Sequence, residues 1–316
     1  MKVVPFHVVH RKALPGGYVI LRVGGEALEC EPGQFVMLRG DWGFSPLLPR
    51  PFSLALVEGP DLTILVKVIG EGSKRLAAVQ RGDVLLIHGP LGTSFRRVAP
   101  DERVLMVGGG VGIAPLLYLA QASRSTAGGG IVCVYGGRSR RDLPMAAELA
   151  AAAESVTFVT EDGTAGEKGL ASRAMVEHLA RAPFDRVVTC GPWAMMATVA
   201  RLAAEAGLPC EVSLEAMMAC GYGICLGCAL PATDGGYVYA CKDGPVIDAG
   251  RIVWGDQPEP SLGTEADKGR RKRGAKTSSA PEAQLPLKGK QATPAPAPSP
   301  PAPSPTPPDQ KGGKRS

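Results

Sequence analysis

Four cysteines lie close together in the C-terminal third of the 316-residue chain, with the spacing C-x4-C-x2-C-x12-C: Cys220, Cys225, Cys228 and Cys241. Three glycines stand between the first three of them. Glycine lets a short loop turn tightly enough for its backbone N–H groups to point at sulfur atoms. A C-x4-C-x2-C run with a distant fourth cysteine is typical of plant-type [2Fe-2S] sites. The spacing therefore predicts a segment folded around a [2Fe-2S] cluster, with these four thiolates as its ligands.

A structural zinc site and unrelated buried thiols are the alternatives for this segment. Zinc sites usually pair one C-x2-C with a second C-x2-C or with an H-x3-5-H. This chain has one C-x2-C, and its other cysteines are scattered: Cys30, Cys133, Cys190 and Cys210. The spacing favours an iron–sulfur cluster, and both alternatives stay open at this point.

The N-terminus indicates where the chain is expected to reside. Residues Met1–Val9 are short and interrupted by Pro5 and His7, which does not fit a signal peptide. No apolar run reaches the roughly 18 residues needed to cross a bilayer. We therefore expect a cytoplasmic protein with no membrane partner, whose cysteines are reduced or bound to metal.

The chain ends in a segment of unusual composition, residues 256–316, rich in Pro, Ala, Ser, Lys and Gly. Such a segment cannot bury enough apolar surface to offset its chain entropy, so we predict a disordered tail. Eleven of the 35 Lys and Arg residues lie in it, which explains the net charge of +5. A cationic tail could contact nucleic acid or an acidic partner, but we interpret it as a solvated extension and expect no nucleic-acid partner.

Two regions with different patterns of predicted strands and helices precede the cysteine segment. Residues 1–98 are β-rich and predict a small antiparallel barrel, with strands at 18–23, 34–38, 52–57, 62–68 and 84–88 and a helix at 73–79 that starts from Ser73 as N-cap. Residues 99–212 alternate strands with helices, which predicts a parallel sheet covered on both faces. The strands are expected at 103–107, 131–135, 156–160, 186–190 and 210–214, and the helices at 114–122, 142–153, 170–181 and 192–206. The predicted fold is thus α+β and multidomain: barrel (1–98), α/β domain (99–212), cysteine domain (213–255) and tail (256–316).

Two stretches of the barrel region could bind phosphate. Arg50-Pro51-Phe52-Ser53 follows a Pro-rich loop, and a guanidinium there could form paired hydrogen bonds with a phosphate. The turn Gly70–Lys74 leads into a short helix, whose free N–H groups could hold an anion. A surface arginine that caps a loop is the alternative for Arg50. Together the two stretches favour a flavin nucleotide.

The α/β region carries a glycine-rich turn between a strand and a helix, at Gly108–Gly112. A pyrophosphate can approach backbone this closely only where side chains are missing, so Gly108, Gly110 and Gly112 are candidate nicotinamide contacts. The turn is not a G-x-G-x-x-G sequence, because Ile113 stands where that pattern has glycine. Cys190-Gly191-Pro192 ends another strand, at the edge where open α/β sheets bind ligands. An ordinary glycine turn and an ordinary helix start with Pro are the alternatives.

Cofactor selectivity stays open at this point. Arg138, Arg140 and Arg141 follow the second strand of the α/β region, where they could bind a 2′-phosphate or be solvated. NADH and NADPH therefore remain alternatives.

The order of these motifs resembles the ferredoxin-NADP reductase superfamily. The series runs Arg-Pro-Phe-Ser, Gly-Glu-Gly-Ser, Gly-Pro-Leu-Gly, Gly-Gly-Gly-Val-Gly-Ile-Ala-Pro and Cys-Gly-Pro. The cysteine cluster, introduced by Ser213-Leu214-Glu215-Ala216-Met217-Met218-Ala219-Cys220-Gly221, is similar to that of the electron-transfer subunits of class 1B dihydroorotate dehydrogenases. The resemblance covers about residues 1–254.

This resemblance implies specific sites. FAD contacts fall on two strand segments and a turn: Arg50, Pro51, Phe52, Ser53, Leu65, Val66, Lys67, Gly72 and Ser73. Val66-Lys67 stand where the family usually has Tyr-Arg. The four cysteines match the family's [2Fe-2S] ligands, and NAD(H) is the implied substrate.

The resemblance also implies a route and a partner. In the family, NADH reduces FAD, FAD feeds the cluster, and the cluster feeds the FMN of a separate catalytic subunit that oxidises dihydroorotate to orotate in pyrimidine synthesis, in a heterotetramer of two copies of each subunit. A flavin is needed between a hydride donor and a one-electron cluster. His7, His10, His88 and His178 are scattered, so no catalytic residue is assigned to this chain, and the partner is expected to dock near residues 221–227. The alternatives are a flavin/[2Fe-2S] reductase subunit of a hydrogenase or NAD(P)H:ferredoxin-type complex, and a zinc-stabilised binding module without redox activity.

Overall fold

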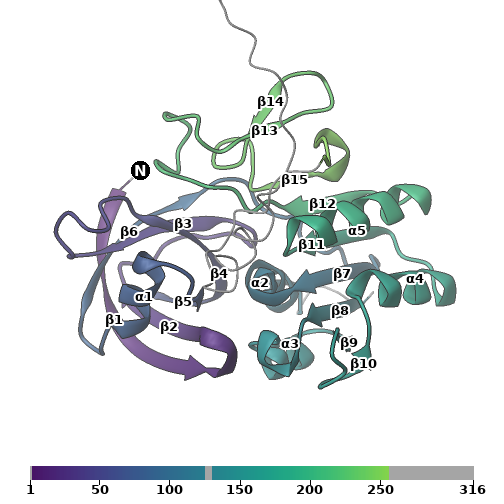
Figure 1. Ribbon diagram of the computed structural model, residues 1–316, viewed down its shortest axis with the longest axis horizontal. Coiled ribbons are helices and arrows are strands. Elements are labelled where there is room, and N and C mark those ends of the chain that lie inside the picture. The colour runs from purple at the N-terminus through teal and green to yellow at the C-terminus, as the bar shows by residue number, and fades with distance from the viewer. Residues whose placement is uncertain (1, 125–129, 256–316) are drawn as a thin grey trace, which may run out of the picture. The chain divides into compact units, whose positions relative to one another are not determined.

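The computed structural model describes residues 2–124 and 130–255 (Figure 1). The predicted tail, residues 256–316, lies outside the described residues. In the described part, a closed barrel, a sheet with helices on both faces and a C-terminal segment follow one another along the chain. This is the predicted α+β architecture. The domain boundaries at residues 98, 212 and 255 stay predictions.

The N-terminal region forms a closed antiparallel barrel in which the strands neighbour one another in the order β1-β2-β5-β4-β3-β6. The strands are β1 (Lys2–Leu14), β2 (Tyr18–Gly25), β3 (Phe35–Gly40), β4 (Arg50–Glu58), β5 (Asp61–Lys67) and β6 (Val84–Leu91). Alternate residues point inward and form one core, which includes Phe6, Leu21, Leu38 and Ile64. The predicted barrel is confirmed.

Strand β1 was not predicted from the sequence. Val4, Phe6 and Val8 are buried, whereas Pro5 and His7 lie between them on the outer surface. These outward residues obscured the alternation. The strand nevertheless closes the barrel, because it pairs with both β2 and β6.

Helix α1 (Glu71–Ala78) begins two residues earlier than expected. The prediction that Ser73 is its N-cap is wrong, because Gly70 occupies that position. Ser73 lies in the first turn, where its hydroxyl accepts hydrogen bonds from the N–H groups of Ile69 at 2.9 Å and Gly70 at 3.0 Å. From within the first turn, the Ser73 side chain thus binds the backbone that leads into the helix, as the third residue of a capping box does.

The α/β region builds a sheet in the order β10-β9-β8-β7-β11-β12-β15. Its strands are β7 (Val104–Gly109), β8 (Ile131–Gly137), β9 (Ser155–Thr160), β10 (Glu167–Lys168), β11 (Arg186–Cys190), β12 (Cys210–Ser213) and β15 (Val246–Asp248). All neighbouring pairs are parallel except β12 with β15. The predicted parallel sheet is confirmed, and the antiparallel strand β15 comes from the cysteine-rich segment.

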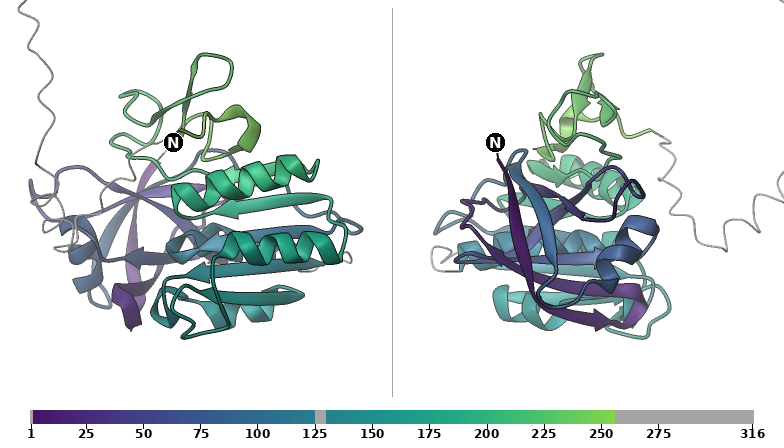
Figure 2. Two further views of the ribbon diagram at one scale, coloured as in Figure 1. Left: turned by 45° about the vertical axis from the view of Figure 1, so that its right-hand side comes forward. Right: turned by 90° about the vertical axis from the view of Figure 1, so that its left-hand side faces the viewer.

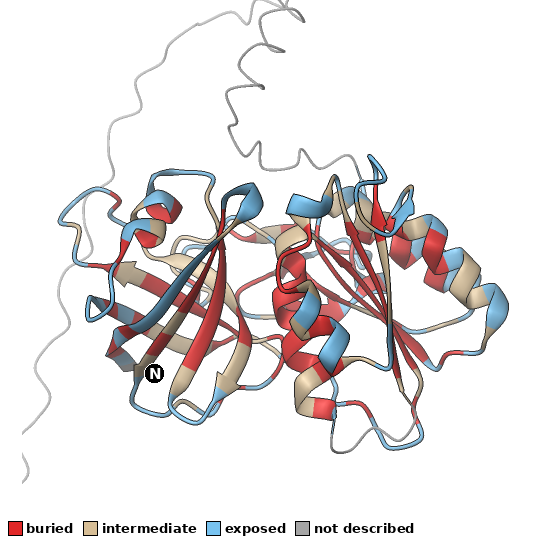
Figure 3. Ribbon diagram, turned by 90° about the horizontal axis from the view of Figure 1, so that it is seen from below, coloured by how far each residue is buried: buried red, intermediate tan, exposed pale blue. Residues whose placement is uncertain are grey.

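Helices cover both faces of this sheet: α2 (Ile113–Ser123), α3 (Ala146–Ala152), α4 (Ala171–Arg181) and α5 (Trp193–Glu205) (Figure 2). Strand β7 shows why both faces are covered. Val104 and Met106 join the core beneath α2 and α3, whereas Leu105 and Val107 join the core beneath α4 and α5. Such strands, buried on both faces, appear as continuous red arrows in Figure 3.

None of the helices in the part of the chain that the structure describes has both the length and the apolar character that a bilayer span requires.

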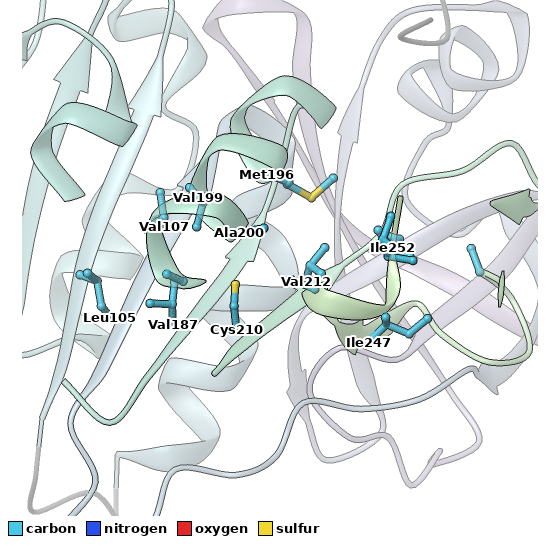
Figure 4. Packing of buried hydrophobic residues seen from close by; sticks show 14 of the residues in the cluster. Leu105, Val107, Val187, Met196, Val199, Ala200, Cys210, Val212, Ile247 and Ile252 are labelled. Carbon is cyan, nitrogen blue, oxygen red and sulfur yellow. The ribbon is translucent and has the colours of Figure 1, made fainter. Parts of the chain in front are cut away.

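The C-terminal segment packs on the rest through a shared core. It contains a hairpin of β13 (Ala229–Pro231) and β14 (Tyr237–Tyr239), followed by β15. Ile247 of β15 lies opposite Val212 of β12, and Met196 of α5 joins the same cluster (Figure 4). This core also contains Met37 of the barrel and Cys228, so one apolar cluster joins all three regions.

Candidate redox site

The four cysteines of the predicted cluster lie in two pairs. The sulfur atoms of Cys228 and Cys241 are 3.2 Å apart, and the N–H of Cys241 donates to Cys228 Sγ at 3.4 Å. The N–H of Cys225 donates to Cys220 Sγ at 3.5 Å. Within residues 2–124 and 130–255, no group of three or more His, Cys, Asp or Glu side chains is arranged to hold a single metal ion. Two irons with two thiolates each fit the observed pairs.

Backbone N–H groups of the cluster loop point at the sulfur atoms. Burial disfavours the thiolate of Cys220, but N–H donation from Cys225, Tyr222 and Ile224 outweighs burial and lowers its pKa to about 6. The N–H of Gly223 donates to Cys241 Sγ at 3.1 Å. Such donors stabilise thiolates and so fit cluster ligands.

Cys241 of the second pair has the opposite pKa shift. Burial, followed by the contact with Cys228, raises the pKa of Cys241 to about 12. Burial therefore disfavours the thiolate of Cys241.

The two pairs also differ in exposure. Cys228 and Cys241 are only 2% and 3% exposed, whereas Cys225 lies on the surface. Ile224 and Leu226, which flank Cys225, are 75% and 52% exposed. The outer pair therefore faces the surrounding solution from an apolar loop, and the inner pair faces the core.

The cluster loop rests directly on the barrel. Gly221 has a φ of 85°, and a Cβ there would come within 2.5 Å of Met37 Cγ. The ring of Tyr222 lies 5.3 Å from that of His88 on β6. Only glycine satisfies both the positive φ and the close approach, so these contacts fix the loop against β3 and β6.

The predicted flavin segments come together where two barrel strands separate. The pairing of β4 with β5 runs from Glu58–Asp61 to Leu54–Ile64. Beyond it, Ser53 pairs instead with Phe35 of β3 and Leu65 with Ile20 of β2. Two facing strand edges are therefore lined by Arg50–Ser53 and Leu65–Lys67, and within the described residues the β4–β5 pairing does not extend to them.

Gly72 and Arg50 lie next to each other in the same region. A Cβ on Gly72 would lie 2.7 Å from Arg50 Nε, so the glycine leaves room for the guanidinium. The guanidinium also donates to the carbonyl of Leu48. The first turn of α1 and a cation are thus adjacent, which is a donor set that fits a diphosphate.

The predicted nicotinamide residues meet at the carboxyl ends of β7 and β11. A Cβ on Gly112 would lie 2.5 Å from the carbonyl oxygen of Cys190, and one on Gly109 would lie 2.7 Å from Pro192 Cδ. Gly110 has a φ of 54°, and its carbonyl accepts a hydrogen bond from Tyr135 at 3.0 Å. The two glycine turns therefore form one surface at the edge where open α/β sheets bind ligands.

Cys190 is held as a neutral thiol beside the two glycine turns, at the junction of the barrel, the α/β region and the cluster segment. Burial raises its pKa well above the usual value, and the charge of Glu215 adds to this, although a hydrogen bond with Ser213 opposes it. No role of Glu215 was predicted from the sequence. Its charge also acts on Tyr18 of the barrel, so it lies where the barrel, the α/β region and the cluster segment meet.

Two further residues of this junction were missed. Tyr18 and Asp142 contact Lys67, which was predicted only as a flavin contact. No local motif marks these residues, because the barrel and the α/β region bring them together from separate parts of the chain.

A groove of about 570 Å³ lies elsewhere, between α5 and the segment after β15. Residues such as Ala200, Arg201, Asp248 and Trp254 line it. None of the predicted cofactor residues lines this groove. The candidate redox site is therefore at the junction of the three regions and not in the groove.

Two family models match the chain. The iron-sulfur cluster binding domain of dihydroorotate dehydrogenase B matches residues 215–253, and the oxidoreductase NAD-binding domain matches residues 106–201. These matches coincide with the cysteine segment and with the sheet that carries the glycine turns.

Solved structures share the fold. A structure of an NADH-dependent reduced ferredoxin-NADP oxidoreductase, studied for flavin-based electron bifurcation, is 29% identical, has a TM-score of 0.73, and aligns over 86% of this chain and 98% of its own. A ferredoxin NADP+ reductase from Neisseria gonorrhoeae with bound FAD and NADP is 20% identical with a TM-score of 0.55, over 66% of this chain and 92% of its own, and shows the fold alone.

Curated relatives narrow the family further. The dihydroorotate dehydrogenase B (NAD(+)) electron transfer subunit of Caldanaerobacter subterraneus subsp. tengcongensis is 39% identical over 71% of this chain and 87% of its own length. The probable subunit of the same kind from Methanopyrus kandleri is 32% identical over 78% of this chain and 90% of its own. The chain belongs to the family of dihydroorotate dehydrogenase B (NAD(+)) electron transfer subunits.

Proposed function

We propose that the chain carries electrons from NADH through FAD and a [2Fe-2S] cluster to the FMN of a catalytic subunit that oxidises dihydroorotate to orotate. The observation that carries this proposal is the shared apolar core, in which Met37 of the barrel, Val107 of the sheet and Cys228 of the cluster segment belong to one cluster. A fixed spacing between the three regions is what successive electron transfers require. FAD, when bound, accepts the two electrons of a hydride together and can release them one at a time.

The barrel residues hold the flavin in this proposal. Arg50 and the first turn of α1 at Gly72 and Ser73 bind the diphosphate. The facing strand edges, Pro51–Ser53 and Leu65–Lys67, hold the ring system. This assignment is supported by the separation of β4 from β5 beyond Leu54–Ile64.

The glycine turns bind the dinucleotide. Gly108, Gly110 and Gly112 leave the backbone accessible to the pyrophosphate. Cys190–Pro192 form the adjoining wall, and the side chain of Cys190 packs into the core behind it at 2% exposure. Burial raises the pKa of Cys190 and the charge of Glu215 adds to this, so the side chain stays a neutral thiol.

The partner docks over residues 221–227 in this proposal, forms a heterotetramer with two copies of each subunit, and contains the FMN. Exposed Ile224 and Leu226 beside the outer cysteine pair support this position. The same proposal includes a cytoplasmic location for the complex.

The dihydroorotate chemistry belongs to the partner. His178 Nε2 lies 2.9 Å from Thr157 Oγ1, and His88 contacts Tyr222, so both histidines have structural contacts away from the glycine turns. We assign no acid or base on this chain to the oxidation of dihydroorotate.

The test is reconstitution with the catalytic subunit. The purified pair should couple dihydroorotate oxidation to NAD+ reduction, and Ile224→Asp should abolish the coupling while iron and FAD content stay unchanged. Val176→Asp, an exposed apolar residue on α4, is the control and should retain coupling. Full coupling with Ile224→Asp would refute the docking position, and no coupling with any variant would refute the function.

A second candidate is a reductase subunit that exchanges electrons with ferredoxin. The observation that favours it is the 29% identity over 98% of the chain from the bifurcating oxidoreductase. NADH-dependent reduction of ferredoxin by the purified chain and its native partner, with no orotate formed from dihydroorotate, would support this candidate.

A further inference from the structure

The side chain of Lys67 joins the barrel to the α/β region. Its Nζ donates to the carbonyl of Gly16 at 2.6 Å and lies 3.5 Å from Asp142 Oδ1. It also lies 3.8 Å from the centre of the Tyr18 ring. The side chains of Lys67 and Asp142 are 28% and 26% exposed, so this ion pair is shielded more than a surface pair. We call these three side chains, Lys67, Tyr18 and Asp142, the Lys67 bridge.

The backbone on both sides of the bridge is also in contact. The turn η1 (Pro15–Gly17) of the barrel packs against η3 (Arg140–Asp142), the turn that follows β8. A Cβ on Gly16 would lie 2.4 Å from the carbonyl oxygen of Arg141. Because Gly16 has a φ of 75°, only glycine allows this approach without strain.

Tyr18 extends the bridge to the glycine turn that we assign to the pyrophosphate. Its side chain is 4% exposed. Burial raises the pKa of Tyr18, and both the charge of Asp142 and a hydrogen bond to it add to this. The hydroxyl lies 3.5 Å from the position of a Cβ on Gly110. Asp142 is thus connected to the turn through one hydroxyl.

A carboxylate this near to the turn disfavours the pyrophosphate of a dinucleotide unless a cation neutralises it. The ammonium of Lys67 is the cation that contacts it. The same contact holds η3, and the hydroxyl of Tyr135 lies within hydrogen-bond distance of both Pro144, just after η3, and Gly110 of the glycine turn. Two effects, charge and position, therefore depend on one side chain.

We propose that Lys67 is a positioning residue for the nicotinamide dinucleotide, acting through Asp142 and Tyr18 on the turn at Gly110. This inference rests on the proposed use of NADH. It goes beyond the assignment of residues 65–67 to the flavin, because it gives the ammonium of Lys67 a separate task.

The experiment uses the full chain loaded with FAD. NAD+ binding is measured by calorimetry, FAD per chain by absorbance, and kcat and KM for NADH with ferricyanide as acceptor. Lys67→Met should raise the Kd of NAD+ and the KM of NADH about tenfold, because coupled neighbours commonly interact at this level. Because Lys67 also lies on the strand edge assigned to the flavin, FAD per chain is measured for each variant, and Kd and KM are determined for FAD-loaded chains alone. Lys67→Arg, which keeps the charge, should bind NAD+ nearly as the wild type does.

Two further variants separate the bridge from a general loss of structure. Lys67→Met/Asp142→Asn should bind NAD+ no more weakly than Lys67→Met alone, since the carboxylate that needs neutralising is gone. Arg22→Met breaks an ion pair of 2.8 Å with Asp61. This pair also joins β2 to β5, the strands that carry Tyr18 and Lys67, and its loss should leave the Kd unchanged. A Kd of Lys67→Met equal to the wild type, or loss of FAD with an unchanged Kd, would overturn the inference. A wild-type chain that binds no NAD+ would instead contradict the proposed function.

Discussion

Gly221 of the cluster loop lies directly against Met37 of barrel strand β3, so closely that a Cβ on Gly221 would come within 2.5 Å of Met37 Cγ. The residue also has a φ of 85°, which side chains rarely adopt. One glycine thus sets both the turn that follows Cys220 and the contact between the cluster segment and the barrel.

The first prediction concerns this contact. Gly221→Ala should lower the iron content of the purified chain several-fold, because the added methyl group strains the loop and displaces it from Met37. Gly227→Ala is the matched control. Its Cβ would meet only Cys225 Sγ, at 3.6 Å, which is an ordinary contact, so iron content should stay near that of the wild type. Equal iron contents in both variants would show that the contact does not position the loop.

The second prediction concerns the flavin. Gly72→Ala should weaken FAD binding about tenfold, because its Cβ would lie 2.7 Å from Arg50 Nε and move the guanidinium. The substitution otherwise favours the helix, since alanine has the higher helix propensity. Gly70→Ala has no atom within 4 Å of its Cβ and is the control. FAD release is followed by fluorescence, and identical affinities for both variants would remove Arg50 from the site.

The third prediction concerns a buried ion-pair network at the opposite ends of the strands. Arg186 on β11 has a side chain that is 2% exposed, and it contacts Glu102 at 2.8 Å and Glu211. Arg186→Met should lower the free energy of unfolding by about 3–5 kcal/mol, because Glu102 would keep a buried charge without this partner. Arg96, also bonded to Glu102 but 59% exposed, is the control. Arg96→Met should cost below about 1 kcal/mol in the same urea unfolding experiment.

The fourth prediction is a pH dependence that arises from the same network. Burial opposes ionisation of Glu102, but a backbone N–H from Ala99 and the charge and hydrogen bonds of Arg186 outweigh it and lower the pKa. A lowered pKa stabilises the fold above the unfolded value of about 4.3, and the stabilisation is lost as the pH falls through the folded value.

The measurement for this dependence compares the wild type with Glu102→Gln. The difference in the free energy of unfolding should be largest near neutral pH and should shrink as the pH falls below about 4. A difference that stays constant throughout this acid range would show that the charge of Glu102 does not stabilise the fold.

Local patterns predicted most of the fold. Strands such as β7 and β11 are continuous apolar runs with turns on both sides, and α4 and α5 begin within one residue of the expected positions. Strand β1 was missed because Pro5 and His7 interrupt its outward face. The three-residue strand β15 was missed because it is too short to show a period, and its pairing with β12 joins residues far apart in the sequence.

The residues of the candidate site likewise divide into those that a local pattern marks and those that only the fold brings together. The cysteines and glycine turns were predicted because their chemistry depends on spacing within a short stretch. Glu215, Tyr18 and Asp142 could not be predicted, since their role depends on contacts between regions that are far apart in sequence. Lys67 was singled out for one contact, and its ion pair with Asp142 became visible only in the fold.

We infer that four thiolates bind two irons beside a flavin that NADH reduces. The contents of iron, acid-labile sulfide and FAD in the purified full chain test this inference, followed by the electron paramagnetic resonance spectrum after NADH is added without oxygen. We expect two irons, two sulfides and one FAD per chain, and a reduced-cluster signal that Cys228→Ser abolishes and Cys133→Ser retains. Zinc in place of iron, or a flavin that NADH bleaches with no cluster signal, would contradict it.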